Sequence, residues 1–267
     1  MGPLLELGFG PAAEQKAYPP HMSEKFLTAL PVYNEAGYVC SVLNEVRKYS
    51  GQVLVVDDGS TDGTAELLAA RDDIRVVTHA TNRGYGAALR TAFDYAMDAG
   101  FPVLVTIDCD GQHEPQRIPR FVDACQGIDL VSGSRYLRRY PGASRPPSQR
   151  RWINRLMTEE INRRLGLNVT DAFCGFKAYR VDALRQLSIE ENGYSMPLEL
   201  WVQAAYAGWS ILELPVPLIY LEEERSFGGA LDDGDIRLQY YHLTLDRSIE
   251  RARRNAGPAS TAEESAS

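Results

Sequence analysis

The sequence predicts a single α/β domain with a central, mostly parallel sheet flanked by helices. Apolar stretches typical of buried strands alternate along the chain with segments whose apolar residues recur at helical spacing. Polar clusters follow three of the expected strands, at residues 33–35, 57–58 and 108–110. Parallel strands end at one edge of their sheet, and ligands of such folds bind beyond that edge. The pattern therefore predicts one site at the carboxyl ends of the strands.

The first half of the chain alternates regularly between the two kinds of segment. Valine and leucine are frequent in the expected strands, whereas Val39, Val42, Leu43 and Val46 lie on one face of the first expected helix. Connections of the strand–helix–strand kind are right-handed and make the joined strands parallel. The expected strands are 26–32, 52–56, 74–79 and 101–107, and the expected helices are 36–49, 65–70 and 86–99.

The second half is less regular. Pro215 and Pro217 interrupt an apolar stretch over residues 209–220, which indicates a strand or pair of strands at an edge of the sheet. The other expected elements are a strand over 129–135 and helices over 116–125, 152–165, 197–206 and 236–253. The chain then divides into a flexible tail over 1–24, the α/β domain over 25–231, an amphipathic helix over 232–254 and a disordered tail over 255–267.

The composition excludes several classes of protein. A net charge of −8 argues against a nucleic-acid partner. The four cysteines form no CxxC pair, so we expect neither a zinc site nor a disulfide framework, and we expect a reduced, cytoplasmic protein. No run approaches the roughly 18 apolar residues of a membrane span, and the N-terminus does not resemble a signal peptide.

Seven arginines and no acidic residue lie between Arg135 and Arg155. Residues 141–148 in the middle of this stretch are rich in Pro, Gly and Ser and are expected to form a loop. One interpretation is a solvated loop. The other is a surface for an anionic partner, such as a diphosphate, a lipid phosphate or a membrane. The amphipathic helix over 236–253 also has two interpretations: it packs on the sheet, or it lies at a membrane interface.

Asp108 and Asp110 are candidate metal ligands. Residues i and i+2 of an extended segment point the same way, so these two carboxylates can share one cation. Oxygen ligands favour Mg²⁺ or Mn²⁺, and such ions usually bridge to substrate phosphates. The alternative is an ordinary turn, because Asp and Gly are common in turns.

Two further clusters suit a nucleoside diphosphate held beside such a metal. The carboxylates of Asp57 and Asp58 can accept hydrogen bonds from a base or a ribose, and Arg83 can bind a phosphate. Gly84 and Gly86 allow the chain to approach a ligand closely before a helix N-terminus. The sequence contains no GxxxxGK(S/T) motif, which excludes a P-loop nucleotide hydrolase.

Taken in order, these motifs resemble those of family 2 inverting glycosyltransferases, which have the Rossmann-like GT-A fold. The resemblance rests on PVYNE from residue 31, VDDGSTDGT from residue 56, NRGYG from residue 82 and DCDGQH from residue 108. Further on, GSR from residue 133 and TDAFCGFK from residue 170 are similar to signatures of one branch of this family. That branch contains dolichol-phosphate mannosyltransferases and polyprenyl-phosphate glycosyltransferases.

The resemblance implies a role for each matched position. The nucleotide sugar would be bound by Pro31, Tyr33, Glu35, Asp57, Asp58, Arg83 and Gly84. The metal would be bound by Asp108, Asp110 and Gln112, and the catalytic centre would comprise Asp108, Asp110, Arg135 and Asp171. The phosphates and the acceptor would be faced by Arg135, Lys177 and Arg225. One departure concerns the last of these, because the Ser-Lys expected shortly after Arg225 is missing from the sequence RSFGGA.

The resemblance also implies an activity. The enzyme would move mannose or glucose from a donor such as GDP-mannose or UDP-glucose to a polyprenyl or dolichyl phosphate, with inversion and with Mg²⁺ or Mn²⁺. Because such an acceptor lies in a bilayer, the protein would work at the inner face of a membrane, alone or with a membrane-protein partner. Three alternatives stay open: a family 2 enzyme with a saccharide or other hydroxyl acceptor, a sugar nucleotidyltransferase, and a non-catalytic homologue that binds nucleotide sugars.

Overall fold

The structure is a computed structural model that describes residues 26–141, 146–219 and 229–255. The expected N-terminal tail, Arg145, Arg225 and nearly all of the expected C-terminal tail lie outside the described residues. Within those ranges we find no helix whose length and apolar content would let it cross a bilayer.

Seven strands form one sheet in the order β3-β2-β1-β4-β6-β5-β7. All neighbouring pairs are parallel except the two that involve β6, which runs antiparallel to β4 and to β5. The strands are β1 (Phe26–Val32), β2 (Val53–Asp57), β3 (Arg75–Thr78), β4 (Val103–Thr106), β5 (Leu130–Ser134), β6 (Lys177–Arg180) and β7 (Ile211–Pro215). The predicted mostly parallel α/β sheet is confirmed, and β7 lies at an edge, as Pro215 and Pro217 predict.

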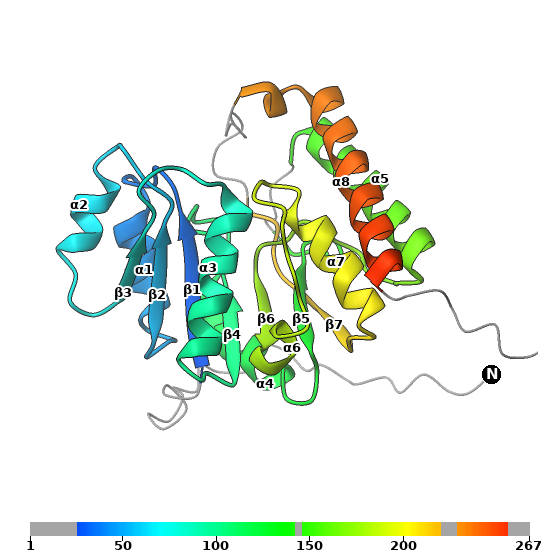
Figure 1. The fold of residues 1–267 in the computed structure, drawn as a ribbon. Helices are drawn as coiled ribbons and strands as arrows, with labels where there is room; N and C mark the ends of the chain where they lie inside the picture. Colours follow the sequence, from blue (N-terminus) through cyan, green and yellow to red (C-terminus); the bar gives the residue numbers. More distant parts are fainter. Residues whose placement is uncertain (1–25, 142–145, 220–228, 256–267) are drawn as a thin grey trace, which may run out of the picture.

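Helices cover both faces of the sheet (Figure 1). One hydrophobic cluster joins a face of the sheet to α3, α5, α6, α7 and α8, and a second joins the opposite face to α1 and α4. The helices are α1 (Val39–Val46), α2 (Thr64–Ala69), α3 (Tyr85–Asp98), α4 (Ile118–Ala124), α5 (Ser148–Leu165), α6 (Val181–Leu184), α7 (Met196–Tyr206) and α8 (Gly234–Asn255), with short 3-10 turns at Pro115–Arg117 and Gly229–Asp232.

The strand β2 shows why the sequence folds in this way. Its apolar run is continuous, and successive side chains of a strand point to opposite faces of the sheet. Leu54 and Val56 therefore join the first cluster, whereas Val53 and Val55 join the second. Because both faces are covered, an unbroken valine and leucine run is stable here, and the first polar side chains appear where the strand ends.

Two helices of the second half differ from the prediction. Helix α5 begins at Ser148 rather than at residue 152, so Arg150 and Arg151 lie on the helix rather than before it. Helix α8 buries its apolar stripe, including Leu245 and Ile249, in the core. Packing on the core is thus the correct interpretation of that stripe.

Helices α5 and α8 lie side by side and run in the same direction (Figure 1). Gln149 contacts Gly234 where the two helices begin. Further along, Arg164 of α5 forms an ion pair with Asp246 of α8 at 2.7 Å. The N-termini of both helices therefore lie at the same end of the molecule, at the carboxyl edge of the sheet (Figure 1).

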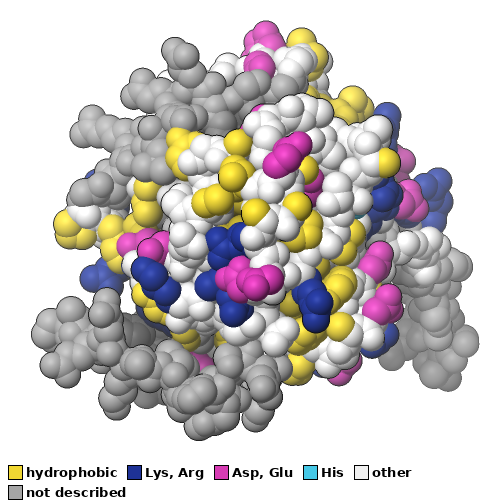
Figure 2. Space-filling model, turned by 90° about the vertical axis from the view of Figure 1, so that its left-hand side faces the viewer, with side chains coloured by type: hydrophobic (Ala, Val, Ile, Leu, Met, Phe, Trp, Pro, Cys, Tyr) yellow, Lys and Arg dark blue, Asp and Glu magenta, His cyan; other side chains and the backbone are white. Residues whose placement is uncertain are grey.

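The side of the molecule that carries α2 and β3 has mixed charge. Basic and acidic side chains lie next to one another there (Figure 2). Asp73 accounts for part of this pattern, because it pairs with Arg47 at 3.3 Å and with Arg71 at 2.8 Å. This side differs in charge from the stretch 135–155, which contains arginines and no carboxylate.

The antiparallel strand β6 was not predicted, and it shapes the site. Because β6 runs against its neighbours, it begins at the edge where β4 and β5 end. The segment that leads into it, residues 170–176, therefore crosses that edge. Asp171 anchors the crossing: its buried carboxylate accepts hydrogen bonds from Nε of Arg135 at 2.7 Å, from Nη2 of Arg135 at 2.9 Å and from Asn154 at 2.8 Å.

We predict that Asp171→Asn lowers the free energy of unfolding by about 3–5 kcal/mol, because it leaves the Arg135 guanidinium without its buried counter-charge. Burial alone would raise the pKa of Asp171, but the charge and hydrogen bonds of Arg135 lower it to about 2, against an ordinary 3.8. The contribution of this carboxylate is complete above pH 3.8 and is lost as the pH falls through about 2.

Urea denaturation at several pH values measures this effect, and the difference between wild type and variant should shrink as the pH falls below 3.8. Glu159→Gln is the matched control, because its carboxylate pairs with Arg155 at 2.7 Å on the surface. Its effect should stay within about 0.5 kcal/mol. Equal effects of the two substitutions would contradict the anchoring role of Asp171.

Candidate active site

One cavity of about 880 Å³ opens at the carboxyl ends of the strands. Its volume lies within the range of about 300–1,000 Å³ that is usual for small-molecule sites. Nine of the predicted site residues line it: Pro31, Tyr33, Glu35, Asp58, Gly84, Asp108, Asp110, Gln112 and Arg135. The expectation that strand ends converge on one site therefore holds for these residues.

The loops that follow β1 and β2 are tied to each other. The backbone N–H of Asn34 donates to Oγ of Ser60 at 2.9 Å, and the side chain of Asn34 accepts from the N–H of Thr61 at 2.8 Å. Asn34 adopts a φ of 56°, in the left-handed region that Asn tolerates better than most residues. Asp57 also stabilises these loops, because its carboxylate accepts a hydrogen bond from the N–H of Ser60 at 3.1 Å. Its side chain does not line the cavity.

Asp58 faces the cavity and also organises the loop after β3. One carboxylate oxygen lies 2.6 Å from Nδ1 of His79 and accepts from the N–H of Arg83 at 2.9 Å. The other oxygen accepts from the N–H of Gly84 at 2.7 Å. The side chain of Arg83 lines a smaller cavity beside α3 instead of the main one.

The N-terminus of α3 is occupied by protein groups. The carbonyl of Asn192 accepts from the N–H of Gly86 at 2.7 Å and of Ala87 at 3.2 Å. Side chains at Gly84 and Gly86 would overlap the backbone of residues 191–192, and Gly84 has a φ of 103°. Gly84 and Gly86 therefore allow the backbone of residues 191–192 to pack against the start of α3. The sequence had suggested instead that they allow a phosphate to approach.

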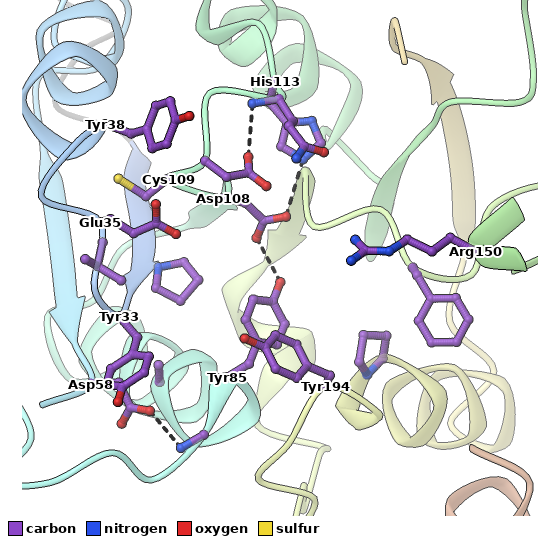
Figure 3. Close-up of a pocket in the computed structure, with 18 of the residues that line it drawn as sticks. Tyr33, Glu35, Tyr38, Asp58, Tyr85, Asp108, Cys109, His113, Arg150 and Tyr194 are labelled. Atoms are coloured by element: carbon purple, nitrogen blue, oxygen red, sulfur yellow. Dashed lines mark hydrogen bonds and ion pairs between the residues drawn. The ribbon is translucent and has the colours of Figure 1, made fainter. Parts of the chain in front are cut away.

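The carboxylates of Asp108 and Asp110 follow β4 (Asp108 is labelled in Figure 3). The hydroxyl of Tyr85 donates to Oδ1 of Asp108 at 3.1 Å, and Nε2 of His113 lies 3.4 Å from Oδ2. Burial raises the pKa of both carboxyls, but the hydrogen bond and charge of His113 bring that of Asp108 below its ordinary value. For Asp110, the charge of Asp108 adds to burial, and the pKa is raised.

Gly175 makes the position of Asp108 possible. A Cβ atom at Gly175 would overlap the carboxylate of Asp108, so any side chain would displace that carboxylate. The hydroxyl of Thr106 donates to the carbonyl of Gly175 at 2.9 Å and fixes the close approach from the β4 side. The crossing segment is thus packed directly against the candidate metal ligands.

The residues at this point fit a divalent cation. Among the described residues no group of three or more His, Cys, Asp or Glu is arranged to hold a metal. The predicted ligands are two carboxylates and one amide, those of Asp108, Asp110 and Gln112, and all three residues line the cavity. Mg²⁺ is commonly held by one or two carboxylates together with substrate phosphates and water. Burial and the neighbouring charge of Asp108 raise the pKa of Asp110, and a bound cation would favour the charged form of this carboxyl.

The opposite wall of the cavity carries arginines and apolar side chains. Arg135 lies at the end of β5, Arg150 on α5 and Arg237 on α8 (Arg150 is shown in Figure 3). The apolar members of this wall are Ile153, Phe173, Leu218 and Tyr241. The sequence signalled Arg150 only as part of a basic stretch, and nothing in the sequence distinguished Arg237 from the other arginines of its helix.

Two of the predicted phosphate residues are not brought to the cavity by the described part of the chain. Lys177 is 2% exposed, its ammonium donates to the carbonyl of Cys174, and it lies 5.5 Å from the centre of the Trp201 ring. Burial lowers the pKa of Lys177. Arg225 lies outside the described residues.

Comparison with solved structures shows the same fold. The structure of glucosyl-3-phosphoglycerate synthase from Mycobacterium tuberculosis with UDP superposes with a TM-score of 0.63 and 19% identity, covering 93% of this chain and 88% of that one. A structure of the same enzyme with Mg²⁺ and UDP gives a TM-score of 0.63, 20% identity and coverages of 88% and 81%. At these identities the likeness shows the fold alone, which is the predicted GT-A fold.

Comparison of sequences shows closer relatives. Undecaprenyl-phosphate mannosyltransferase of Micrococcus luteus is 34% identical over 242 residues, which cover 86% of this chain and 98% of the relative. Polyprenol monophosphomannose synthase of Mycolicibacterium smegmatis is 33% identical over 207 residues, which cover 73% and 77%. The model of the family described as Glycosyl transferase family 2 matches residues 28–188, more than half of the chain. The chain therefore belongs to glycosyltransferase family 2 and is a glycosyltransferase enzyme.

Proposed function

We propose that this enzyme moves a hexose from a nucleotide diphosphate sugar to a polyprenyl phosphate with inversion, using Mg²⁺ or Mn²⁺. The observation that carries the proposal is the composition of one cavity. Its first wall offers the carboxylates of Asp58, Asp108 and Asp110, and its second offers Arg135 and Arg150 beside apolar side chains. The names of the two relatives support the same reaction and favour mannose as the sugar.

The nucleoside would lie at the ends of β1 and β2, near Tyr33, Glu35 and Asp58. Tyr33 is 42% exposed, so its ring is available to a ligand in the cavity. Pro31 lines the same region. Asp57 would act indirectly, by holding the loop that presents Asp58. GDP-mannose and UDP-glucose are the donors to test first, because the residues at this end do not distinguish the two bases.

The diphosphate of the donor would lie next to Asp108, Asp110 and Gln112, which would hold the metal ion. When bound, the ion supplies positive charge that stabilises the leaving diphosphate. Tyr85 and His113 position the Asp108 carboxylate from two sides, and Gly175 leaves room for it. These contacts hold the Asp108 carboxylate in place.

The phosphate of the acceptor would lie near Arg135 and Arg150. A phosphate monoester has a second pKa of about 6 and is therefore already an anion near neutral pH. Such a nucleophile needs positioning and charge screening more than a strong general base. Arg135 suits this task because two hydrogen bonds to the carboxylate of Asp171 hold its guanidinium in place.

The reaction would be a single displacement. An oxygen of the acceptor phosphate forms a bond to the anomeric carbon while the bond from that carbon to the donor diphosphate breaks. The electron pair of the broken bond leaves with the nucleoside diphosphate, and attack from the opposite face inverts the configuration. The residues of this chain contribute orientation and charge, which dominate catalysis of this kind of transfer.

The lipid part of the acceptor would leave the cavity along its apolar wall, past Phe173, Leu218 and Tyr241. Leu137 and Trp152, which are 45% and 52% exposed, are sequence neighbours of the cavity-lining residues Tyr136 and Ile153. Arg138, Arg139 and Arg151 are exposed beside them in the sequence. We propose that this basic surface associates with the anionic face of a membrane and so brings the cavity to its acceptor.

We predict that Asp110→Asn reduces metal-dependent transfer by about 100-fold or more, because it removes a ligand charge at nearly constant shape. The measurement is transfer of labelled hexose to a polyprenyl phosphate at several Mg²⁺ and Mn²⁺ concentrations. Asp123→Asn, an exposed site on α4, is the control and should match wild type. Wild-type turnover in EDTA would contradict the metal proposal.

We predict that Asp58→Asn weakens binding of nucleoside diphosphates by about tenfold or more, because the carboxylate both faces the ligand and holds the 83–84 backbone. Calorimetric titration with GDP and UDP measures this. Asp98→Asn, exposed at the end of α3, is the control. Unchanged affinity for both nucleotides would show that the end of β2 does not contact the nucleoside.

We predict that replacing Arg138, Arg139 and Arg151 with Ser reduces sedimentation with phosphatidylglycerol vesicles at low salt. Each arginine near an anionic surface contributes about 1 kcal/mol, so the partition coefficient should fall about 100-fold. The control replaces Arg163, Arg253 and Arg254, which are exposed at the far ends of α5 and α8, and removes the same charge. Equal losses in both triple variants would refute docking through the surface at the cavity.

A further inference from the structure

Two stacked tyrosines, Tyr85 and Tyr194, line the cavity, and the proposed function gives no role to Tyr194. The rings of Tyr85 and Tyr194 are 5.8 Å apart between centroids, with an interplanar angle of 19°. Both line the cavity, between Asp58 on one side and Arg150 on the other, with Asp108 facing them (Figure 3). Tyr85 uses its hydroxyl to position Asp108, whereas Tyr194 is 39% exposed although it lies in a cavity wall.

The loop that carries Tyr194 is held by side chains from neighbouring elements. Oε1 of Glu191 accepts from the hydroxyl of Tyr240 on α8 at 2.7 Å and from the N–H of Gly193 at 2.8 Å. Glu199 of α7, which is 1% exposed, accepts from the N–H of Glu191 at 2.7 Å. The position of Tyr194 is therefore set before any ligand binds, as a specific contact requires.

The α3 side of this loop is equally fixed. The carbonyl of Asn192 caps α3 through Gly86 and Ala87, and the guanidinium of Arg90 contacts the side chain of Asn192. Tyr85 is the first residue of α3. The contacts of Asn192 therefore join the loop of Tyr194 to the helix end that carries Tyr85. A loop held this firmly holds the exposed part of Tyr194 in one place at the cavity surface.

We propose that Tyr194, supported by Tyr85, is the contact that recognises the hexose of the donor. The proposal rests on the proposed function, because it places the nucleoside near Asp58 and the diphosphate near Asp108. The sugar attached to that diphosphate would then lie close to Asp108, and the rings of Tyr85 and Tyr194 are next to this carboxylate in the cavity (Figure 3). A tyrosine suits a pyranose, since its ring packs against apolar C–H groups and its hydroxyl can hydrogen-bond.

The electrostatics of the site agree with this position. Burial raises the pKa of Tyr194, and the charges of Asp108 and Asp58 raise it further. The phenol of Tyr194 is a hydrogen-bond donor at neutral pH, as is usual for tyrosine. It can donate a hydrogen bond to a sugar hydroxyl, and a site that hydrogen-bonds a substrate hydroxyl discriminates strongly against analogues that lack it.

The test compares each nucleotide with its sugar derivative. Calorimetric titrations with GDP and GDP-mannose, and with UDP and UDP-glucose, are run in Mg²⁺ on wild type, Tyr194→Phe and Tyr194→Ala. For the preferred pair, Tyr194→Ala should weaken binding of the nucleotide sugar by about tenfold and that of the nucleotide by less than about twofold. Tyr194→Phe, which keeps the ring, should weaken sugar binding by about three- to fivefold.

Tyr206→Phe is the matched control, because Tyr206 is a tyrosine of similar exposure, 43%, outside the cavity lining. It should leave all four affinities unchanged. Equal losses for nucleotide and nucleotide sugar in Tyr194→Ala, or no loss for either, would overturn this inference alone. Wild-type protein that binds none of the four ligands would instead contradict the proposed function as a whole.

Discussion

The ion pair between Arg135 and the buried carboxylate of Asp171 is the interaction on which the candidate site depends. It joins the end of β5 to the segment that crosses the sheet edge, and Asn154 ties α5 to the same carboxylate at 2.8 Å. A charge pair taken out of water is stable only when its geometry is good and its remaining polar atoms are satisfied. Asp171 meets this condition, because the backbone N–H groups of Arg135 and Phe173 also donate to it. Contacts within the protein therefore position the part of the site formed by the end of β5, residues 170–176 and α5.

The part of the site at the ends of β2 and β4 could be predicted from the sequence, because it depends on patterns within short segments of the chain. Buried strands are readable as apolar runs, and the residue at which a run stops marks the carboxyl edge of the sheet. Asp58, Asp108 and Asp110 were found in this way, and all three line the cavity. The antiparallel strand β6 could not be found so easily. It is four residues long, and its place between β4 and β5 is decided by pairing with strands far away in the sequence.

A second limit concerns neighbouring residues within one motif. Asp57 and Asp58 are adjacent, yet only Asp58 faces the cavity, while Asp57 is 0% exposed and bonds the loop beside it. Lys177 ends a matching motif but lies inside the fold, beneath the Trp201 ring. A sequence motif includes residues that bind a ligand and residues that only stabilise a loop. Only the direction of each side chain separates these roles, and that direction depends on packing.

The distribution of charge explains why the site needs both halves of the chain. The proposed donor and acceptor are both anions, and bringing two like charges close together in one cavity is unfavourable unless other charges compensate. The carboxylates of the parallel half can place a divalent cation on one side of the reacting carbon. The arginines at the end of β5, on α5 and on α8 place positive charge on the other side. In a chain of net charge −8, arginines gathered at one cavity would offset the repulsion between the two phosphates of the proposed reaction.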